Sequence, residues 1–323
     1  MNLIRRRLPE IAFAALFCVG LVLGGNAALA GLPKFLDAAM PGMAAQANAE
    51  GNLAHGVARL AVPADYLRQS SRSARPGPAS AEASAQSASP DNVPSRPVIA
   101  ICIDDLGEDV AGTDKAIRLP KEVALSFLPY ADTTPFLAEA AGRQGHLVLA
   151  HVPMQALGGQ DPGPMALNSG MAADEIARRL GWNLAQVPGL VGINNHEGSR
   201  FTADSASLKP VMASLRARHL FFLDSRTGPD SQAEPAARAL GVLTAGRDVF
   251  LDDDQSPAAV GAELETLARE AKRTGVAIAI GHPHDVTLKM LAAWLAQDHG
   301  VTLVPLDEAI HLKNLRPAAL AAR

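Results

Sequence analysis

Two adjacent acidic residues, Asp104 and Asp105, directly follow the apolar run Val98–Ile103. This run lies between Pro97 and Gly107 and is typical of a buried β-strand. Because a buried charge without a partner is costly, the two carboxylates cannot both be core residues. A carboxylate pair at the C-terminal end of a strand in an α/β fold suits a metal ligand beside a general base. The structural alternative is a turn whose Asp caps a helix.

The ends of later apolar runs carry further polar residues: His151, His196, Asp224, and the pair His282 and His284. In a parallel barrel all these strand ends open on one face. Each residue alone fits a structural role, and their joint occurrence indicates a site. Asp and His ligands without Cys suit a divalent ion such as zinc, with cobalt, nickel and manganese as alternatives. A metal, a carboxylate base and a His acid are equipment for hydrolysing an amide or an ester.

A run of three acidic residues, Asp252–Asp254, follows another apolar segment, Val249–Leu251. We interpret this run as the cap of a helix that begins near Pro257, with Asp252 as a minor candidate for the site.

From Pro97 onward, short apolar runs alternate with amphipathic stretches, which is typical of a parallel sheet covered on both faces. The predicted strands are Val98–Ile103, Val123–Phe127, Leu147–Ala150, Leu190–Ile193, Phe221–Leu223, Val249–Leu251, Val276–Ile280 and Thr302–Val304. The predicted helices are Phe136–Arg143, Ala173–Ala185, Ser205–Arg218, Ala233–Leu240, Ala258–Thr274 and Thr287–Asp298. This pattern predicts a distorted (β/α) barrel of seven or eight mostly parallel strands, with a doubly wound open sheet as the alternative.

The first 30 residues are typical of an export signal, with Arg5–Arg7, an apolar stretch Ile11–Leu23 and a cleavage motif Ala28–Ala30. A retained signal anchor is the alternative, and only then would the protein be attached to a membrane. Residues 31–96 form a Ser/Ala/Pro-rich linker that we expect to be disordered, and residues 97–315 form the folded domain. We therefore expect a periplasmic or secreted protein.

The bulk composition excludes some functions. A formal net charge of −4 without a basic stripe argues against nucleic acid as a partner. Aromatic residues make up only 4% of the chain, which argues against a carbohydrate-binding module built on exposed aromatic platforms. Of the two cysteines, Cys18 lies in the signal and Cys102 on the first strand, where we expect it to be a small buried hydrophobe.

Several long motifs, in order along the chain, resemble the divergent polysaccharide deacetylase family. They are Ile101–Gly107, Leu125–Tyr130, His151–Gln155, Gly192–Thr202, Phe222–Thr227 and Gly281–His284. The resemblance covers about residues 97 to 312. It implies a barrel of the deacetylase type, a divalent metal that we expect to be zinc, and a polysaccharide or oligosaccharide substrate.

The resemblance also implies roles for single residues. Asp104 would be the base and Asp105 a metal ligand, with His282 as the general acid. The better-known relatives take two further ligands from a His-x-x-x-His motif. Here Arg200 stands four residues after His196, and Gln155 stands four after His151. If a metal binds, His151 and His196 must come from separate strands.

Four residues are expected to support this site. Arg200 or Arg226 would hold Asp104 ionised or stabilise an oxyanion, and Asp224 and His284 would lie beside it. The expected activity is metal-dependent deacetylation of an envelope or exported polysaccharide. A catalytically silent glycan-binding or scaffolding domain is one alternative, because the His-x-x-x-His motif is missing. A hydrolase of another bond, such as a peptide amide, is a second.

Overall fold

A computed structural model describes residues 96–321 of the chain. The predicted signal and nearly all of the predicted linker lie outside these residues. Within the described residues, no helix has both the length and the apolar character that crossing a membrane requires.

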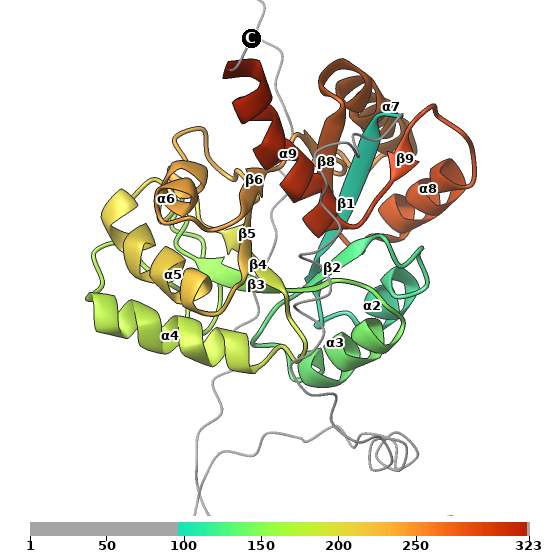
Figure 1. Cartoon of the computed structure of the whole chain (residues 1–323). Coiled ribbons are helices and arrows are strands. Elements are labelled where there is room, and N and C mark those ends of the chain that lie inside the picture. Colours follow the sequence, from blue (N-terminus) through green and yellow to red (C-terminus); the bar gives the residue numbers. More distant parts are fainter. Residues whose placement is uncertain (1–95, 322–323) are drawn as a thin grey trace, which may run out of the picture. The chain divides into compact units, whose positions relative to one another are not determined.

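The described chain alternates strands and helices around one curled sheet (Figure 1). The strands are β1 (Val98–Leu106), β2 (Ala124–Phe127), β3 (Val148–Met154), β4 (Gly192–Glu197), β5 (Phe221–Asp224), β6 (Thr244–Gly246), β7 (Val249–Phe250), β8 (Val276–Gly281) and β9 (Thr302–Leu303). The helices are α2 (Val110–Ala116), α3 (Thr134–Arg143), α4 (Ala173–Ala185), α5 (Ser205–Ala217), α6 (Ala233–Ala239), α7 (Pro257–Thr274), α8 (Asp285–Leu295) and α9 (Leu306–Ala321).

The strand order β6-β5-β4-β3-β2-β1-β8-β7 follows the chain for most of the sheet, and every pair is parallel. The two edge strands, β6 and β7, are separated by only Arg247 and Asp248. Arg247 N donates to Asp224 O on β5 (2.9 Å), and Asp248 N donates to Ile278 O on β8 (2.8 Å). This short segment therefore joins both edges, and the sheet forms the expected distorted (β/α) barrel rather than a doubly wound open sheet.

Strand parity decides which side chains enter the barrel. On β1, Ile99, Ile101 and Ile103 pack in the layer shared with the surrounding helices, whereas Val98, Ala100 and Cys102 belong to an inner cluster. Each fully buried Ile contributes about 1.5–3 kcal/mol by leaving water. The even-numbered residues of β1 thus point inward, so the next one, Asp104, does as well.

The last helix, α9, packs against the inner cluster. Its residues Leu306, Ala309 and Ile310 are fully buried there with Val98 and Val276, the first residues of β1 and β8. Figure 1 shows α9 against these two strands. Because α9 covers the end where the strands begin, the opposite end, where they finish, is the one available for a site.

Two helices and one strand were not predicted. The short helix α2 contains Gly112 and lacks an apolar period, and it begins at a side-chain cap, where Asp109 accepts from Ala111 N (3.0 Å). In α9 only the first turns show the apolar spacing of a helix, at Leu306, Ala309 and Ile310, and the helix as a whole has no single apolar face. Strand β6 has only three residues, which is too short for its sequence to show an alternation.

Candidate functional site

The adjacent carboxylates of Asp104 and Asp105 reach the open end of the barrel in different ways. Asp104 points inward by strand parity and is 1% exposed. Asp105 has the opposite parity, but its backbone is left-handed (φ 56°), and the pairing with β2 shifts register between Ile103 and Leu106. Such an irregularity re-aims a side chain. Both adjacent carboxylates therefore face the same site.

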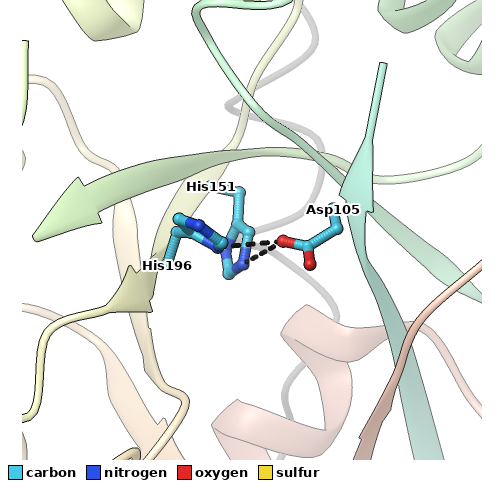
Figure 2. A group of neighbouring side chains, drawn as sticks. All are labelled: Asp105, His151 and His196. Atoms are coloured by element: carbon cyan, nitrogen blue, oxygen red, sulfur yellow. Dashed lines mark ion pairs between the residues drawn. The ribbon is translucent and has the colours of Figure 1, made fainter. Parts of the chain in front are cut away.

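Asp105, His151 and His196 come together at this end of the barrel, as Figure 2 shows. Asp105 Oδ1 lies 3.2 Å from His151 Nε2 and 2.9 Å from His196 Nδ1. His151 is on β3 and His196 on the neighbouring strand β4, so two strands supply the imidazoles. One potential ligand atom from each of the three residues lies within 4.8 Å of the other two.

The contacts of Asp105 Oδ1 fit a metal site. The oxygen is buried, yet it receives no hydrogen bond of acceptable geometry from any described group, although two ring nitrogens lie close to it. Burial raises the pKa of Asp105, but the two imidazoles outweigh burial and hold that pKa well below its usual value. An ionised carboxylate and two imidazole nitrogens form a donor set that suits zinc with an open position. These three residues would hold the ion.

Asp104 is held in the barrel by neutral groups. Asn194 Nδ2 lies 2.8 Å from both of its carboxylate oxygens, and the Cys102 thiol donates to Oδ1 (3.3 Å). The other oxygen, Oδ2, lies 3.6 Å from His151 Nε2. Oδ2 is therefore the oxygen that faces the three-residue cluster.

His282 directly follows β8 and approaches the same cluster. Its Nε2 lies 3.8 Å from Asp105 Oδ2, and its Nδ1 lies 2.9 Å from Asp252 Oδ1. Burial lowers the pKa of His282, but the hydrogen bond and charge of Asp252, with the charges of Asp104 and Asp105, raise it to about 9. The ring is thus a protonated imidazolium near neutral pH, and it presents an N–H to the site.

Asp252 does not cap a helix, so this interpretation of the sequence was wrong. Ser256 caps α7 through its hydroxyl, which accepts from Ala259 N (3.2 Å). Asp252 is buried and accepts from the backbone N of His282 (2.7 Å) and from the hydroxyl of Thr287 (2.8 Å), in addition to its contact with the ring. It orients His282.

Three of the four expected supporting residues lie elsewhere. Asp224 shares its parity with Phe222, which packs in the layer shared with the helices, so Asp224 points away from the interior. It is buried and accepts from Arg226 N (2.8 Å) and Ser231 Oγ (2.7 Å), which fixes the loop after β5. Arg226 forms an ion pair with Glu234. Arg200 is exposed, and its guanidinium has no hydrogen bond or ion pair with any residue in 96–321.

Neither arginine therefore contacts Asp104. An arginine that does interact electrostatically with Asp104 is Arg247, whose guanidinium donates to Ser225 O (2.8 Å) and stacks over Phe250 (4.6 Å). No pattern in the sequence identifies Arg247, because it stands between two very short strands. The fourth supporting residue, His284, lies beside His282, with ring centroids 5.9 Å apart, and contacts Gln255.

A pocket of about 350 Å³ lies in the loop between β3 and α4. Its lining includes the amides of Gln155 and Asn168, and Gln155 directly follows the strand that carries His151. Tyr130 packs against Gly163 of the same lining. Burial and the charges of Glu108, Asp105 and Asp161 raise the pKa of Tyr130 to about 12. Tyr130 thus interacts with the charge of Asp161 in the pocket and with the charge of Asp105 in the three-residue cluster.

The sequence matches one family profile and two uncharacterized bacterial proteins. The sequence profile of a family described as divergent polysaccharide deacetylase matches residues 101–310. The chain is 37% identical over 193 residues to the uncharacterized protein YibQ of Escherichia coli K12, covering 60% of each chain. It is 35% identical over 197 residues to an uncharacterized protein of Haemophilus influenzae Rd, covering 61% of this chain and 70% of that one. The match thus spans less than two thirds of the Escherichia coli relative.

The fold is also similar to a solved structure. The crystal structure of the uncharacterized protein ATU2773 from Agrobacterium tumefaciens C58 superposes with a TM-score of 0.64 at 31% identity, covering 66% of this chain and 89% of that one.

Proposed function

Because the chain belongs to the divergent polysaccharide deacetylase family, we propose that it is a metal-dependent carbohydrate deacetylase. In this proposal it hydrolyses an acetyl amide or ester on an envelope or exported polysaccharide. The observation that carries the proposal is the cluster of Asp105, His151 and His196, with Asp104 on one side and His282 on the other.

The residues around the cluster can divide the hydrolysis between them. A zinc ion, when bound, polarises the acetyl carbonyl and lowers the pKa of water. Asp104 accepts a proton from the attacking water through Oδ2, the oxygen that faces the cluster. His282 donates the proton on Nε2 to the departing nitrogen or oxygen of the sugar, and Asp252 keeps the ring oriented. Water and the acetyl group thereby give acetate and a free amine or hydroxyl.

The pocket in the loop after β3, the strand that carries His151, suits a polar polymer. It is lined by amide, carboxylate and guanidinium groups from Gln155, Asn168, Asp161 and Arg179. Such groups hydrogen-bond to sugar hydroxyls. We further propose that the N-terminal segment exports the protein to the periplasm or the medium, with attachment to a membrane if that segment is retained.

A silent glycan-binding domain is the main alternative, and the absence of His-x-x-x-His is the observation that favoured it. This absence has less force here, because β3 and β4 each supply one histidine to the cluster. In this proposal, His151 and His196 take the place of the two histidines of that motif.

Metal content and acetate release test the proposal. The purified full-length chain, dialysed against zinc, should retain about one zinc ion per chain. It should release acetate from oligosaccharides that carry N-acetyl or O-acetyl groups, and chelation should stop the release until zinc is restored. A chain that binds these glycans but neither retains zinc nor releases acetate would instead be the silent domain.

A further inference from the structure

We propose that Asn194 is a positioning residue that prepares both halves of the site: it sets the ring of His151 for the metal and the carboxylate of Asp104 for the water. The proposal rests on the proposed function. The side chain of Asn194 points inward from β4 and is fully buried. From β4 it contacts His151 on the neighbouring strand β3 and, across the interior of the barrel, Asp104 on β1.

Each atom of the Asn194 amide has partners of its own. Its Oδ1 lies 2.6 Å from Ser126 Oγ and 2.8 Å from His151 Nδ1. Its Nδ2 donates to both oxygens of Asp104 at 2.8 Å and also contacts Ser225 Oγ at 3.3 Å. A single buried side chain thus contacts the candidate base and a candidate metal ligand directly.

Chemistry fixes the orientation of this amide. An ionised carboxylate accepts hydrogen bonds and has none to donate, so the NH₂ group of Asn194 must face Asp104. The carbonyl oxygen then faces His151 Nδ1, which must carry a proton to donate to it. A flipped amide would set two acceptors against each other at Asp104 and leave His151 Nδ1 without an acceptor.

This orientation of the amide also determines which nitrogen of the His151 ring can bind a metal. With the proton of neutral His151 on Nδ1, the lone pair is on Nε2, the atom that faces Asp105 Oδ1 at 3.2 Å. Ligating histidines characteristically donate their other ring N–H in this way, which fixes both the tautomer and the ring orientation. Through Asn194, the same amide that aligns Asp104 makes His151 ready to bind a metal.

Two substitutions separate these two contacts. Asn194→Asp keeps an oxygen that accepts from His151 and Ser126 but replaces the NH₂ group with a second carboxylate oxygen facing Asp104. Asn194→Ala removes both contacts. The matched control is Asn183→Ala. Asn183 is equally buried, but it donates only to Met165 O in the loop before α4 and to Arg179 O on α4 itself.

Zinc affinity of the full-length chain is the first readout. We expect Asn194→Ala to bind zinc about 10–100-fold more weakly, as is usual when a partner of a ligating histidine is lost. Asn194→Asp should bind zinc with about the wild-type affinity and yet release acetate at least about 100-fold more slowly, because the new carboxylate and Asp104 share a proton, and Asp104 then accepts a proton from water less readily. Asn183→Ala should lower the melting temperature and leave zinc affinity unchanged.

The tautomer of His151 is the second readout, and it needs no metal. Long-range ¹H–¹⁵N NMR on the metal-free chain, at a pH where His151 is neutral, should show the proton on Nδ1 in wild type and in Asn194→Asp, and a mixture in Asn194→Ala. The inference is overturned if Asn194→Ala keeps the wild-type tautomer and zinc affinity, or if Asn194→Asp loses zinc as severely as Asn194→Ala. Absence of zinc from the wild type, with the expected tautomers, would overturn the proposed function alone.

Discussion

The imidazole rings of His151 and His196 meet edge to face across two adjacent parallel strands, with centroids 5.0 Å apart and an angle of 68°. In the pairing of β3 with β4, His151 is opposite Asn194 and His196 is opposite Pro153. The two histidines are therefore offset by two register positions and keep the same inward parity. Two strands thus achieve what a pair of histidines four residues apart in one segment would otherwise provide.

This relationship predicts that each histidine is needed for metal binding. His151→Ala and His196→Ala should each weaken zinc binding by at least about 100-fold, because a three-residue ligand set loses one member. Burial lowers the pKa of His151, but Asp104 and Asp105 outweigh burial and raise it. Zinc binding near neutral pH should therefore release a proton, which calorimetry in buffers of different ionisation enthalpy would detect.

His311→Ala is the control for these variants, since His311 is exposed on α9, at the opposite end of the barrel. Its zinc affinity should equal that of the wild type. Wild-type affinity in either ligand variant would show that the cluster does not hold the metal.

The role of Asp104 predicts a separation of metal binding from activity. Asp104→Asn preserves the shape of the side chain but not its ability to accept a proton, so acetate release should fall by about 10²–10⁴-fold. Zinc content should remain at the wild-type level, because the three proposed ligands are untouched. Acetate release at the wild-type rate would mean that another group is the base.

Much of the fold and part of the site can be predicted from one sequence pattern, in which apolar runs end in polar residues. Apolar runs locate the strands, and polar residues just after or late in those runs locate the open end of the barrel. The alternation along each strand then separates inward from outward side chains. His151 shares parity with Leu149, and His282 shares parity with Ile280, both of which belong to the inner cluster. By the same rule Asp224 points away, and the rule could have excluded it.

Other parts of the site depend on contacts between distant segments. Asp105 faces the site only because its backbone is left-handed, and alternation alone would turn it outward. Asp252 looks like a helix cap because two more aspartates follow it, whereas its partners, His282 and Thr287, lie 30 and 35 residues away. Asn194 and Arg247 acquire their roles from neighbours on other strands. Such pairings become visible only when the barrel closes.

The contact between His282 and Asp252 predicts a titration. In the metal-free chain the pKa of His282 is raised to about 9, so the ring should stay protonated through neutral pH. Asp252→Asn removes the largest of the contributions that raise this pKa and should return it toward the ordinary value of about 6.5. NMR titration of the ring protons measures both values, and a bound zinc ion should lower the wild-type pKa because like charges repel.

The same shift sets the direction of a stability change. Because the pKa is higher in the folded chain than in the unfolded chain, this contact stabilises the fold fully below about pH 6.5. That stabilisation is lost as the pH rises through about 9. Wild type should therefore lose its stability advantage over Asp252→Asn across this range. A difference in melting temperature that stays constant from pH 6 to pH 10 would contradict the contact.

The thiol below the candidate base should be inert in the folded protein. Cys102 is buried, and burial, the charge of Asp104 and the hydrogen bond to it raise the pKa of the thiol well above its ordinary value. Because the thiolate is the reactive form, a disulfide reagent such as Ellman's should modify no thiol in a folded Cys18→Ser variant. The same variant should give one modified thiol after unfolding in guanidinium. Rapid modification of the folded chain would mean that solvent reaches the inner cluster, and it would contradict a closed barrel beneath Asp104.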